Sequence, residues 1–591
     1  MKITYTYKVL TIIGLLTVGL SSLKSQVTIP FEKDDNYSAS YEEAISLYQE
    51  LARQHPGQLQ LTTHGMTDSG YPLHTAVLSL DGVFEPAAIK ALDKRILFIN
   101  NAIHPGEPCG IEATLLLFRD FLEKKIPQKS LEKVVLVAIP FYNIGGGLNR
   151  TAYSRANQKG PVLYGFRGNA KNLDLNRDFI KCDTKNAQTF NQIYNHWKPE
   201  VFIDNHTSNG SDYQYTLTLI ATQHNKLNPH VAEFMNNTLL PQLYDEMSKT
   251  DWEMIPYVYA RSTPDKGIRG FLDLPRYSSG YAALHNAISF MPETHMLKPY
   301  RGRVKSVYTF MQKMVDAMAE HSEAVKMAYQ KAIQSDLERT SFDLNWTLDN
   351  EKSDEIMFKG YEAAYKPSLI SGKDRLYYDH DKPFEKKIPY FNYYKPTLSV
   401  EKPVAYIIPQ AYYKVIERLK WNGVEVQQLT EDTELEVDYY YIDDYNTGRG
   451  PYEGHYLHSN VKVSTKTMKY VFNKGDYVVK MNQAANRYLI STLEPQAPDA
   501  FFAWNFFDGI LNQKEYFSSY VFEDLAHEYL EENPDLKAKL EERKKNDPKF
   551  AESGRAQLDF VYKNSPYYEA THRRYPVARL IKETYLPMKS N

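Results

Sequence analysis

The chain is poor in cysteine, in long apolar runs and in surplus charge of either sign. It has 591 residues but two cysteines, Cys109 and Cys182. This count excludes a disulfide-dense scaffold and a structural zinc site built from four cysteines, and it leaves open whether the two pair. Lys and Arg total 70 while Asp and Glu total 73, so the basic surplus of a general nucleic-acid binder is absent, and we expect no nucleic-acid partner. The hydrophobic fraction of 42% is typical of an ordinary globular protein.

One apolar run near the N-terminus stands apart from the rest of the chain. It covers Val9–Leu20, follows Lys2 and precedes three small polar residues, Ser21, Ser22 and Ser25. The order of basic, apolar and small residues is typical of a secretory signal peptide, and the run is too short for a comfortable membrane span. We therefore predict residues 1–26 to be a signal peptide and the protein to be exported, periplasmic or extracellular. No later run is long enough to cross a bilayer, so we expect no stable membrane insertion after cleavage.

Buried strands and amphipathic helices alternate in the first half of the chain. Three apolar runs show no alternation of polar residues, which is typical of strands covered on both faces: Ile96–Ile99, Val134–Ile139 and Val201–Ile203. Helical patterns at 112–122 and 186–197 lie between them and predict an α/β layered domain. A capping box at Ser40–Glu43 predicts the start of an earlier helix, and Asp68–Tyr71 is expected to form a hairpin turn.

The composition and pattern of the sequence change near residue 340, after a long helical stretch predicted at about 301–337. We predict a catalytic domain at 27–340 and an accessory region at 341–591, β-rich at 341–402 and then α/β to helical at 403–591. Pro403 opens a second β-α-β pattern, with a strand at Val404–Ile408, a helix at Tyr412–Trp421 and a strand at Val424–Leu429. The part after about residue 516 is predicted to be helical and highly charged. No motif in the accessory region indicates chemistry.

Two predicted strand ends carry metal-ligating side chains. His104 and Glu107 follow the first buried run and flank a Pro-Gly turn, and His206 ends the run that begins at Val201. In open α/β sheets, ligands bind at the carboxyl ends of the strands. Two imidazoles and a carboxylate suit Zn²⁺, and three protein ligands leave one position open, which is the pattern of a catalytic zinc site.

Two further segments supply a candidate carboxylate clamp and a candidate general base. Asn176 and Arg177 lie in the segment that begins at Asp174, and a guanidinium beside an amide can hold a carboxylate through parallel hydrogen bonds. Glu293 ends a largely apolar segment, where partial burial would raise its pKa toward the range of a general base.

These motifs, in this order and spacing, resemble those of the zinc carboxypeptidases, the carboxypeptidase A-like metallopeptidases. The resemblance covers roughly residues 40–320. The chain is similar to an exported, bacterial-type member of this family with a C-terminal accessory region. The resemblance implies a mixed, largely parallel twisted sheet flanked by helices, followed by a second α/β or α+β region. It also implies one zinc ion per chain and a peptide substrate with a free C-terminus.

The resemblance assigns a role to each matching residue. His104, Glu107 and His206 correspond to the zinc ligands, and Asp174 to the carboxylate that orients the first histidine. Glu293 corresponds to the general base that takes the proton of the attacking water. The pair that holds the terminal carboxylate is Asn176 and Arg177.

Other assignments stay open at the level of the sequence. Arg155 best matches the arginine that polarises the scissile carbonyl, with Arg150 and Arg167 as rivals. Tyr277 and Tyr281 both qualify as the tyrosine that caps the substrate. The turn Asn143–Gly146 and Asp178 depart from the family pattern. His295 either tunes the pH dependence of the general base or has only a structural role. The segment Ser278–Gly280 lacks an acidic residue, which disfavours a preference for C-terminal Lys or Arg.

Two alternative functions remain. One is a zinc amidase or peptidase acting on cell-wall stem peptides, which would keep the zinc ligands and Glu293 but need a different substrate clamp. The other is a non-catalytic binding protein that uses the Tyr-rich surface. A second metal site at Glu453, His455 and His458 is a further alternative to ordinary loop residues.

Overall fold

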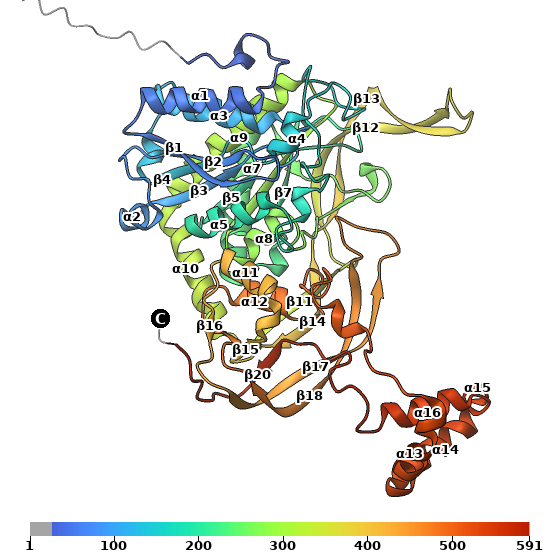
Figure 1. Cartoon of the computed structure of the whole chain (residues 1–591). Coiled ribbons are helices and arrows are strands. Elements are labelled where there is room, and N and C mark those ends of the chain that lie inside the picture. The colour runs from blue at the N-terminus through green and yellow to red at the C-terminus, as the bar shows by residue number, and fades with distance from the viewer. Residues whose placement is uncertain (1–26, 590–591) are drawn as a thin grey trace, which may run out of the picture.

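A mixed sheet of nine strands forms the centre of the computed structural model, which describes residues 27–589 (Figure 1). The strand order is β1-β2-β4-β3-β5-β10-β7-β8, with β6 paired to β10. The strands are β1 (Leu59–Met66), β2 (Pro72–Leu78), β3 (Arg95–Asn100), β4 (Val134–Ile139), β5 (Val201–Asp204), β6 (His206–Ser208), β7 (Leu217–Ala221), β8 (Met254–Pro256) and β10 (Ile288–His295). The central strands β4, β3, β5 and β10 are parallel, and β1, β2 and β7 join antiparallel. The predicted fold class, a mixed and largely parallel sheet flanked by helices, is confirmed.

Helices cover both faces of this sheet, which explains why its strands are apolar without alternation. The helices of this half are α1 (Tyr41–Gln54), α2 (Pro86–Ala91), α3 (Cys109–Leu122), α4 (Ile144–Leu148), α5 (Lys185–Trp197), α6 (Pro229–Phe234), α7 (Leu240–Ser248), α8 (Ser278–Leu284), α9 (Tyr300–Glu320) and α10 (Ser322–Glu338). Phe98 of β3 points into a core with α5 and α8, whereas its neighbours Leu97 and Ile99 point into a second core with α3 and α9.

Local signals in the sequence match the elements that form. The Ser40 hydroxyl accepts a hydrogen bond from the Glu43 N–H at 3.2 Å, and the Glu43 carboxylate accepts one from the Ser40 N–H at 2.8 Å, so the predicted capping box is present. The hairpin turn at Asp68–Tyr71 joins β1 and β2. The helical stretch expected at 301–337 is two helices, α9 and α10, which meet at His321.

The region 341–402 is rich in strands, and two of them are long rather than short. β12 (Asp354–Pro367) and β13 (Asp374–Phe391) form a hairpin that projects from the body of the molecule (Figure 1). β11 (Ser341–Leu348) pairs with β14 (Tyr394–Glu401). β13 also pairs with β9 (Ile268–Arg269), so this region joins the catalytic half through a strand ladder.

The last third of the chain builds a second sheet of six strands and a separate helical lobe. The sheet order is β16-β19-β15-β20-β17-β18, and α11 (Tyr413–Trp421) and α12 (Asn486–Leu493) belong to the same part of the chain. The strands are β15 (Ala405–Ile408), β16 (Gln427–Gln428), β17 (Thr433–Thr447), β18 (His458–Phe472), β19 (Tyr477–Lys480) and β20 (Ala578–Leu580). The predicted strand at 424–429 is thus reduced to two residues. The lobe consists of α13 (Ser519–Glu532), α14 (Pro534–Asn546), α15 (Pro548–Ala551) and α16 (Gly554–Lys563), and it projects at the end opposite α1 (Figure 1).

The accessory region packs directly on the catalytic half. One hydrophobic core contains Phe190 and Tyr281 from the first part and Tyr406 and Tyr488 from the second. The predicted boundary near 340 falls between α10 and β11, and it stays a prediction, since a single core continues across it.

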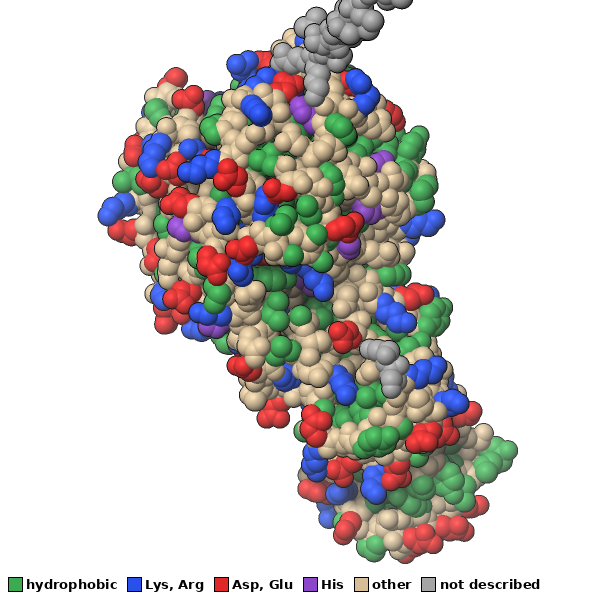
Figure 2. Space-filling model, turned by 90° about the vertical axis from the view of Figure 1, so that its left-hand side faces the viewer, with side chains coloured by type: hydrophobic (Ala, Val, Ile, Leu, Met, Phe, Trp, Pro, Cys, Tyr) green, Lys and Arg blue, Asp and Glu red, His purple; other side chains and the backbone are tan. Residues whose placement is uncertain are grey.

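Three expectations concern the chain as a whole. The predicted signal peptide lies outside the described residues, and within 27–589 no helix combines the length and apolarity that crossing a membrane requires. Cys109 and Cys182 are both buried and free, so no disulfide joins them. On the face drawn in Figure 2, basic and acidic side chains are interspersed.

Candidate active site

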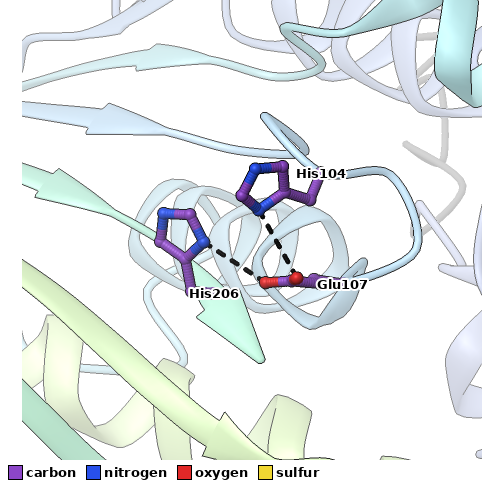
Figure 3. A group of neighbouring side chains, drawn as sticks. All are labelled: His104, Glu107 and His206. Atoms are coloured by element: carbon purple, nitrogen blue, oxygen red, sulfur yellow. Dashed lines mark hydrogen bonds and ion pairs between the residues drawn. The ribbon is translucent and has the colours of Figure 1, made fainter. Parts of the chain in front are cut away.

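The loop after β3 and the start of β6 bring three ligating side chains together. His104 and Glu107 lie between β3 and α3, and His206 is the first residue of β6, next to the end of β5. Nδ1 of His104 lies 3.4 Å from one Glu107 carboxylate oxygen, and Nδ1 of His206 lies 3.2 Å from the other (Figure 3). One donor atom of each residue lies within 4.8 Å of the others. All three side chains are buried, with exposures of 2–3%.

The second nitrogen of each histidine contacts a carboxylate. His104 Nε2 lies 2.9 Å from Asp174 Oδ1, and His206 Nε2 lies 2.9 Å from Asp204 Oδ2. These contacts fix both rings with Nδ1 directed at the shared site, an arrangement that is usual for histidines that bind metal. Two imidazole nitrogens and one carboxylate oxygen, with an outer carboxylate on each imidazole, fit Zn²⁺. The sequence indicated Asp174 but not Asp204, although Asp204 lies only two residues before His206.

The two outer carboxylates have electrostatic consequences. Burial alone would raise the pKa of Asp174, but the charges of His104, Arg167 and Arg177 hold it well below its usual value. Burial likewise would lower the pKa of His206, yet the adjacent Asp204 carboxylate raises it well above the ordinary value. Asp204 therefore increases the basicity of the His206 imidazole.

Glu293 lies beside these residues, on β10. It is in register with His206 across the β10–β6 ladder and lines the same cavity. Burial raises the pKa of Glu293 to about 7, and the negative charge of Glu107 adds to the rise, while His206 and two arginines oppose it. A cation held by the three ligating side chains would lower this pKa again.

The three candidate arginines lie in different surroundings. Arg155 donates hydrogen bonds to the Glu107 carboxylate at 2.5 Å and to the Thr207 carbonyl at 2.9 Å. Arg167 lies 2.8 Å from the Asp174 carboxylate, and its side chain is 44% exposed, against 15% for Arg155. Both line the cavity. Arg150 does not, since its guanidinium donates to the Ser38 and Ala39 carbonyls.

Asn176 and Arg177 also line the cavity, in a short 3₁₀ turn at Leu175–Arg177. The Asn176 side-chain oxygen accepts a hydrogen bond from the Ser278 N–H at 2.9 Å. The Arg177 guanidinium stacks on the Tyr277 ring at 4.4 Å and donates to the Tyr452 hydroxyl at 3.0 Å. This guanidinium is therefore presented to the cavity in a defined orientation.

The structure separates the two candidate tyrosines. Tyr277 lines the cavity. Tyr281 is fully buried in the core, where its hydroxyl donates to Asn422 at 2.7 Å and accepts from Asn195 at 2.9 Å. A third tyrosine, Tyr257, lines the cavity but carried no signal in the sequence. Its pKa is raised by burial and by the nearby Glu293.

The other histidines singled out in the sequence, His295, His455 and His458, each contact another group of the protein. His455 contacts Asp183 at 2.6 Å, whereas His458 contacts Asp508 at 3.0 Å. Within residues 27–589, the His104–Glu107–His206 group is the one place where three or more such side chains converge, so the alternative second metal site at 453–458 is wrong. His295 lies 2.9 Å from the Ser211 carbonyl.

The Asn143–Gly146 turn and Asp178, which depart from the expected pattern, both have structural roles. Asn143 caps α4 by accepting from the Gly146 N–H at 2.9 Å, and its amide donates to the Arg167 carbonyl at 2.9 Å. The turn thereby supports an arginine of the site. Asp178 accepts from the buried Lys181 ammonium at 2.8 Å and from the Thr184 N–H at 3.0 Å, which is a role in holding the loop before α5.

Comparison with known proteins places this geometry in a family. The family model for zinc carboxypeptidase matches residues 44–344, about half of the chain. Carboxypeptidase 2 of Trichophyton rubrum is 20% identical over 421 residues, covering 68% of this chain and 72% of the relative. Carboxypeptidase 2 of Trichophyton tonsurans is 19% identical over 422 residues, with the same coverage. An alignment that covers 68% of 591 residues must extend beyond residue 344 even if it starts at residue 1. These alignments therefore continue past the family match.

Solved structures with lower similarity include two carboxypeptidases. Carboxypeptidase A from Helicoverpa armigera is 14% identical with a TM-score of 0.39, covering 51% of this chain and 78% of that one. A metallo-carboxypeptidase from Pseudomonas aeruginosa is 16% identical with a TM-score of 0.35, covering 47% and 69%. With half of its length matched by the family model and a His-Glu-His group suited to zinc, this chain belongs to the zinc carboxypeptidase family and is a zinc metallocarboxypeptidase.

Proposed function

We propose that the protein removes residues one at a time from the free C-terminal end of peptides, with Arg177 as the clamp for the terminal carboxylate. The observation that carries this proposal is the position of Arg177, which lines the same cavity as His104, Glu107, His206 and Glu293. A guanidinium binds a carboxylate through two parallel hydrogen bonds. Asn176 stands beside it, so both groups can contact the end of a bound chain.

The reaction needs a base and a means of stabilising negative charge. His104, Glu107 and His206 would hold a zinc ion, which would supply the Lewis acidity for activating water and polarising the scissile carbonyl. Glu293 takes the proton from the attacking water and passes it to the leaving amine. Its position at the buried end of β10, facing His206, supports this role.

We assign the stabilisation of the developing oxyanion to Arg167 rather than to Arg155. Two donors of Arg155 are already bound to the Glu107 carboxylate and the Thr207 carbonyl, which makes it a support for a zinc ligand. Arg167 is anchored by Asp174 and also lies 3.4 Å from Glu107, yet its side chain is 44% exposed, against 15% for Arg155, and it lines the cavity. Comparison of Arg167→Ala with Arg155→Ala tests this choice. Loss of one such donor costs about 10²–10³ in kcat, and we expect this loss for Arg167→Ala, whereas Arg155→Ala should reduce zinc affinity.

The lining of the cavity supports an apolar preference at the C-terminal residue. Ile220, Phe271 and Met291 contribute apolar surface, and within the described residues the acidic lining groups are Glu107 and Glu293 alone. Both of these have assigned roles at the metal site, so no carboxylate remains to pair with a lysine or arginine side chain. We therefore propose aromatic and aliphatic C-terminal residues as the preferred leaving residues.

The cellular setting is proposed from the sequence. The basic, apolar and small segments of residues 1–26 support export to the periplasm or the exterior of the cell. The residues beyond the family match, which ends at 344, support a member with a C-terminal accessory region.

The test is mass spectrometry of peptide pairs that differ only in a free or an amidated C-terminus. We expect stepwise shortening of the free-ended peptides alone, fastest for apolar terminal residues. Glu293→Gln should remove turnover while the zinc content per chain stays at one, because the three ligands are untouched. Equal cleavage of both peptides of a pair would overturn the clamp, and near-normal rates in Glu293→Gln would overturn the base.

A further inference from the structure

A loop of the accessory region reaches the residues that hold the clamp and the first zinc ligand. It lies between β17 and β18, and its tip is Tyr452–His455. The Tyr452 hydroxyl accepts a hydrogen bond from Arg177 Nε at 3.0 Å, and a Glu453 carboxylate oxygen accepts one from the Asp174 N–H at 2.7 Å. Both partners lie more than 270 residues earlier in the chain.

The loop tip has a fixed conformation. Tyr452 and His455 exchange two backbone hydrogen bonds, at 2.7 and 3.1 Å. Glu453 between them has a φ of +50°, a left-handed conformation that non-glycine residues seldom adopt. The surrounding contacts therefore hold it, among them the contact of His455 with Asp183 at 2.6 Å.

The Tyr452 ring is held as firmly as the loop backbone. It stacks on Trp504, with ring centroids 6.1 Å apart and planes 20° from parallel. The Arg276 guanidinium lies 5.4 Å from the Tyr452 ring and is itself paired with Asp499 at 2.8 Å. Trp504 and Asp499 also come from the accessory region, so Tyr452 enters the site on a rigid support.

Tyr452 determines which edge of the Arg177 guanidinium is free. Nε donates to Tyr452, and one terminal nitrogen, Nη1, donates to the Asn176 carbonyl at 2.7 Å. Within the described residues, the other terminal nitrogen, Nη2, makes no hydrogen bond to the protein. A carboxylate that binds through two parallel bonds can use the edge that contains Nε or the end formed by the two terminal nitrogens. Tyr452 occupies the single N–H of Nε, whereas Nη1 keeps a second N–H beside the free Nη2, so the end with the terminal nitrogens remains for the substrate.

From these contacts we infer that the Tyr452–Glu453 tip is a positioning element of the active site. Tyr452 orients the Arg177 guanidinium toward the substrate carboxylate, and Glu453 holds the backbone of Asp174, the partner of His104. This inference rests on the proposed role of Arg177 as the clamp. It gives the accessory region a function in substrate binding that its own sequence does not indicate.

The first test compares Tyr452→Phe with a matched control. The phenylalanine keeps the ring between Trp504 and Arg276 and removes the hydroxyl, which accepts the Arg177 hydrogen bond and also interacts with Arg276. Loss of a hydrogen bond to a charged group should raise KM for a free-ended peptide about tenfold, with kcat within about twofold of wild type. The control, Tyr456→Phe, removes a hydroxyl from the same loop at a residue that is 51% exposed, and both constants should stay unchanged.

The second test separates this inference from the clamp itself. If Tyr452 acts through Arg177, then Tyr452→Phe should add no further rise in KM in an Arg177→Ala background. If Arg177→Ala alone leaves KM unchanged, the clamp and the inference both fail. If Arg177→Ala raises KM while Tyr452→Phe does not, the inference alone is wrong. An equal effect of Tyr452→Phe in both backgrounds also overturns it, because that would indicate a general structural role.

Glu453 provides a third, independent readout. Glu453→Gln keeps an oxygen that can accept from the Asp174 N–H, whereas Glu453→Ala removes it. We expect the glutamine variant to keep wild-type KM and the alanine variant to show a several-fold higher KM at an unchanged melting temperature. Identical values of KM for the two variants would overturn the role of Glu453.

Discussion

Removal of the Asp204 carboxylate should weaken zinc binding. Asp204 is fully buried, and one of its oxygens lies 2.9 Å from His206 Nε2. Its second oxygen accepts from the Asn100 amide at 3.0 Å. The carboxylate thus fixes the ring of His206 and increases the basicity of the nitrogen that faces the metal.

The size of the effect follows from what each substitution removes. Asp204→Asn loses the charge but keeps an acceptor for His206, because the Asn100 amide can turn and present its oxygen to the new amide group. Asp204→Ala loses both the charge and the acceptor. Loss of such a partner typically costs 10–100-fold in metal affinity, which is about 1.4–2.7 kcal/mol. We expect about tenfold for the asparagine variant and about 100-fold for the alanine variant.

Competition with a chromophoric chelator at fixed pH measures this affinity directly. The matched control is Asp212→Asn, since Asp212 is also buried and contacts a histidine, His380, at 2.6 Å, but neither residue belongs to the zinc ligand group. Its zinc affinity should equal that of the wild type. If both Asp204 variants bound zinc within about twofold of the wild type, the argument that the outer carboxylate strengthens the ligand would be refuted.

Two further predictions concern stability. Lys181 is fully buried and donates to Asp178 at 2.8 Å and to Asp183 at 3.0 Å, so Lys181→Met should leave buried negative charge unpaired and cost about 3–5 kcal/mol. Denaturant unfolding would measure this loss, and an unchanged midpoint would contradict it. Burial raises the pKa of Glu112 from its ordinary 4.5 to about 7, so the folded state binds this proton more tightly than the unfolded chain, and stability should fall by up to about 3 kcal/mol as pH rises through that interval. Glu112→Gln should make the melting temperature less dependent on pH between 5 and 8, and identical pH profiles for the two proteins would count against this account.

The parts of the fold that depend on local pattern were predictable. The strand-end positions of His104 and His206 follow from apolar runs that are buried on both faces, since such runs predict parallel strands whose ends share one edge. The capping box at Ser40 is equally local. By contrast, the length of the β12–β13 hairpin was missed, because its strands are largely exposed and rich in polar and charged residues, and therefore carry no strong apolar signal.

The parts of the site that depend on tertiary contacts were not predictable. Asp204 lies next to Asn205 and His206 in the sequence, but nothing there shows that its carboxylate returns to the same imidazole. Tyr277 and Tyr281 are four residues apart, and only the packing of α8 against the core separates a cavity residue from a buried one. Arg155 and Arg167 differ in the same way, since the choice between them depends on how far each side chain is exposed in the folded protein.

The contact between Tyr452 and Arg177 shows why an accessory region without a chemical motif can still influence catalysis. A guanidinium has five donors, and its usefulness as a clamp depends on which of them remain free. The catalytic half supplies Arg177, the stacking ring of Tyr277 and the Asn176 carbonyl, but no acceptor for Nε within the described residues. That acceptor comes from a tyrosine 275 residues later in the chain. A catalytic half cut after the family match would therefore retain every zinc ligand and the base, yet its arginine would lose the acceptor that holds Nε. For this reason we expect the substrate clamp, rather than the metal site, to be the part of the active site that depends most on the C-terminal region.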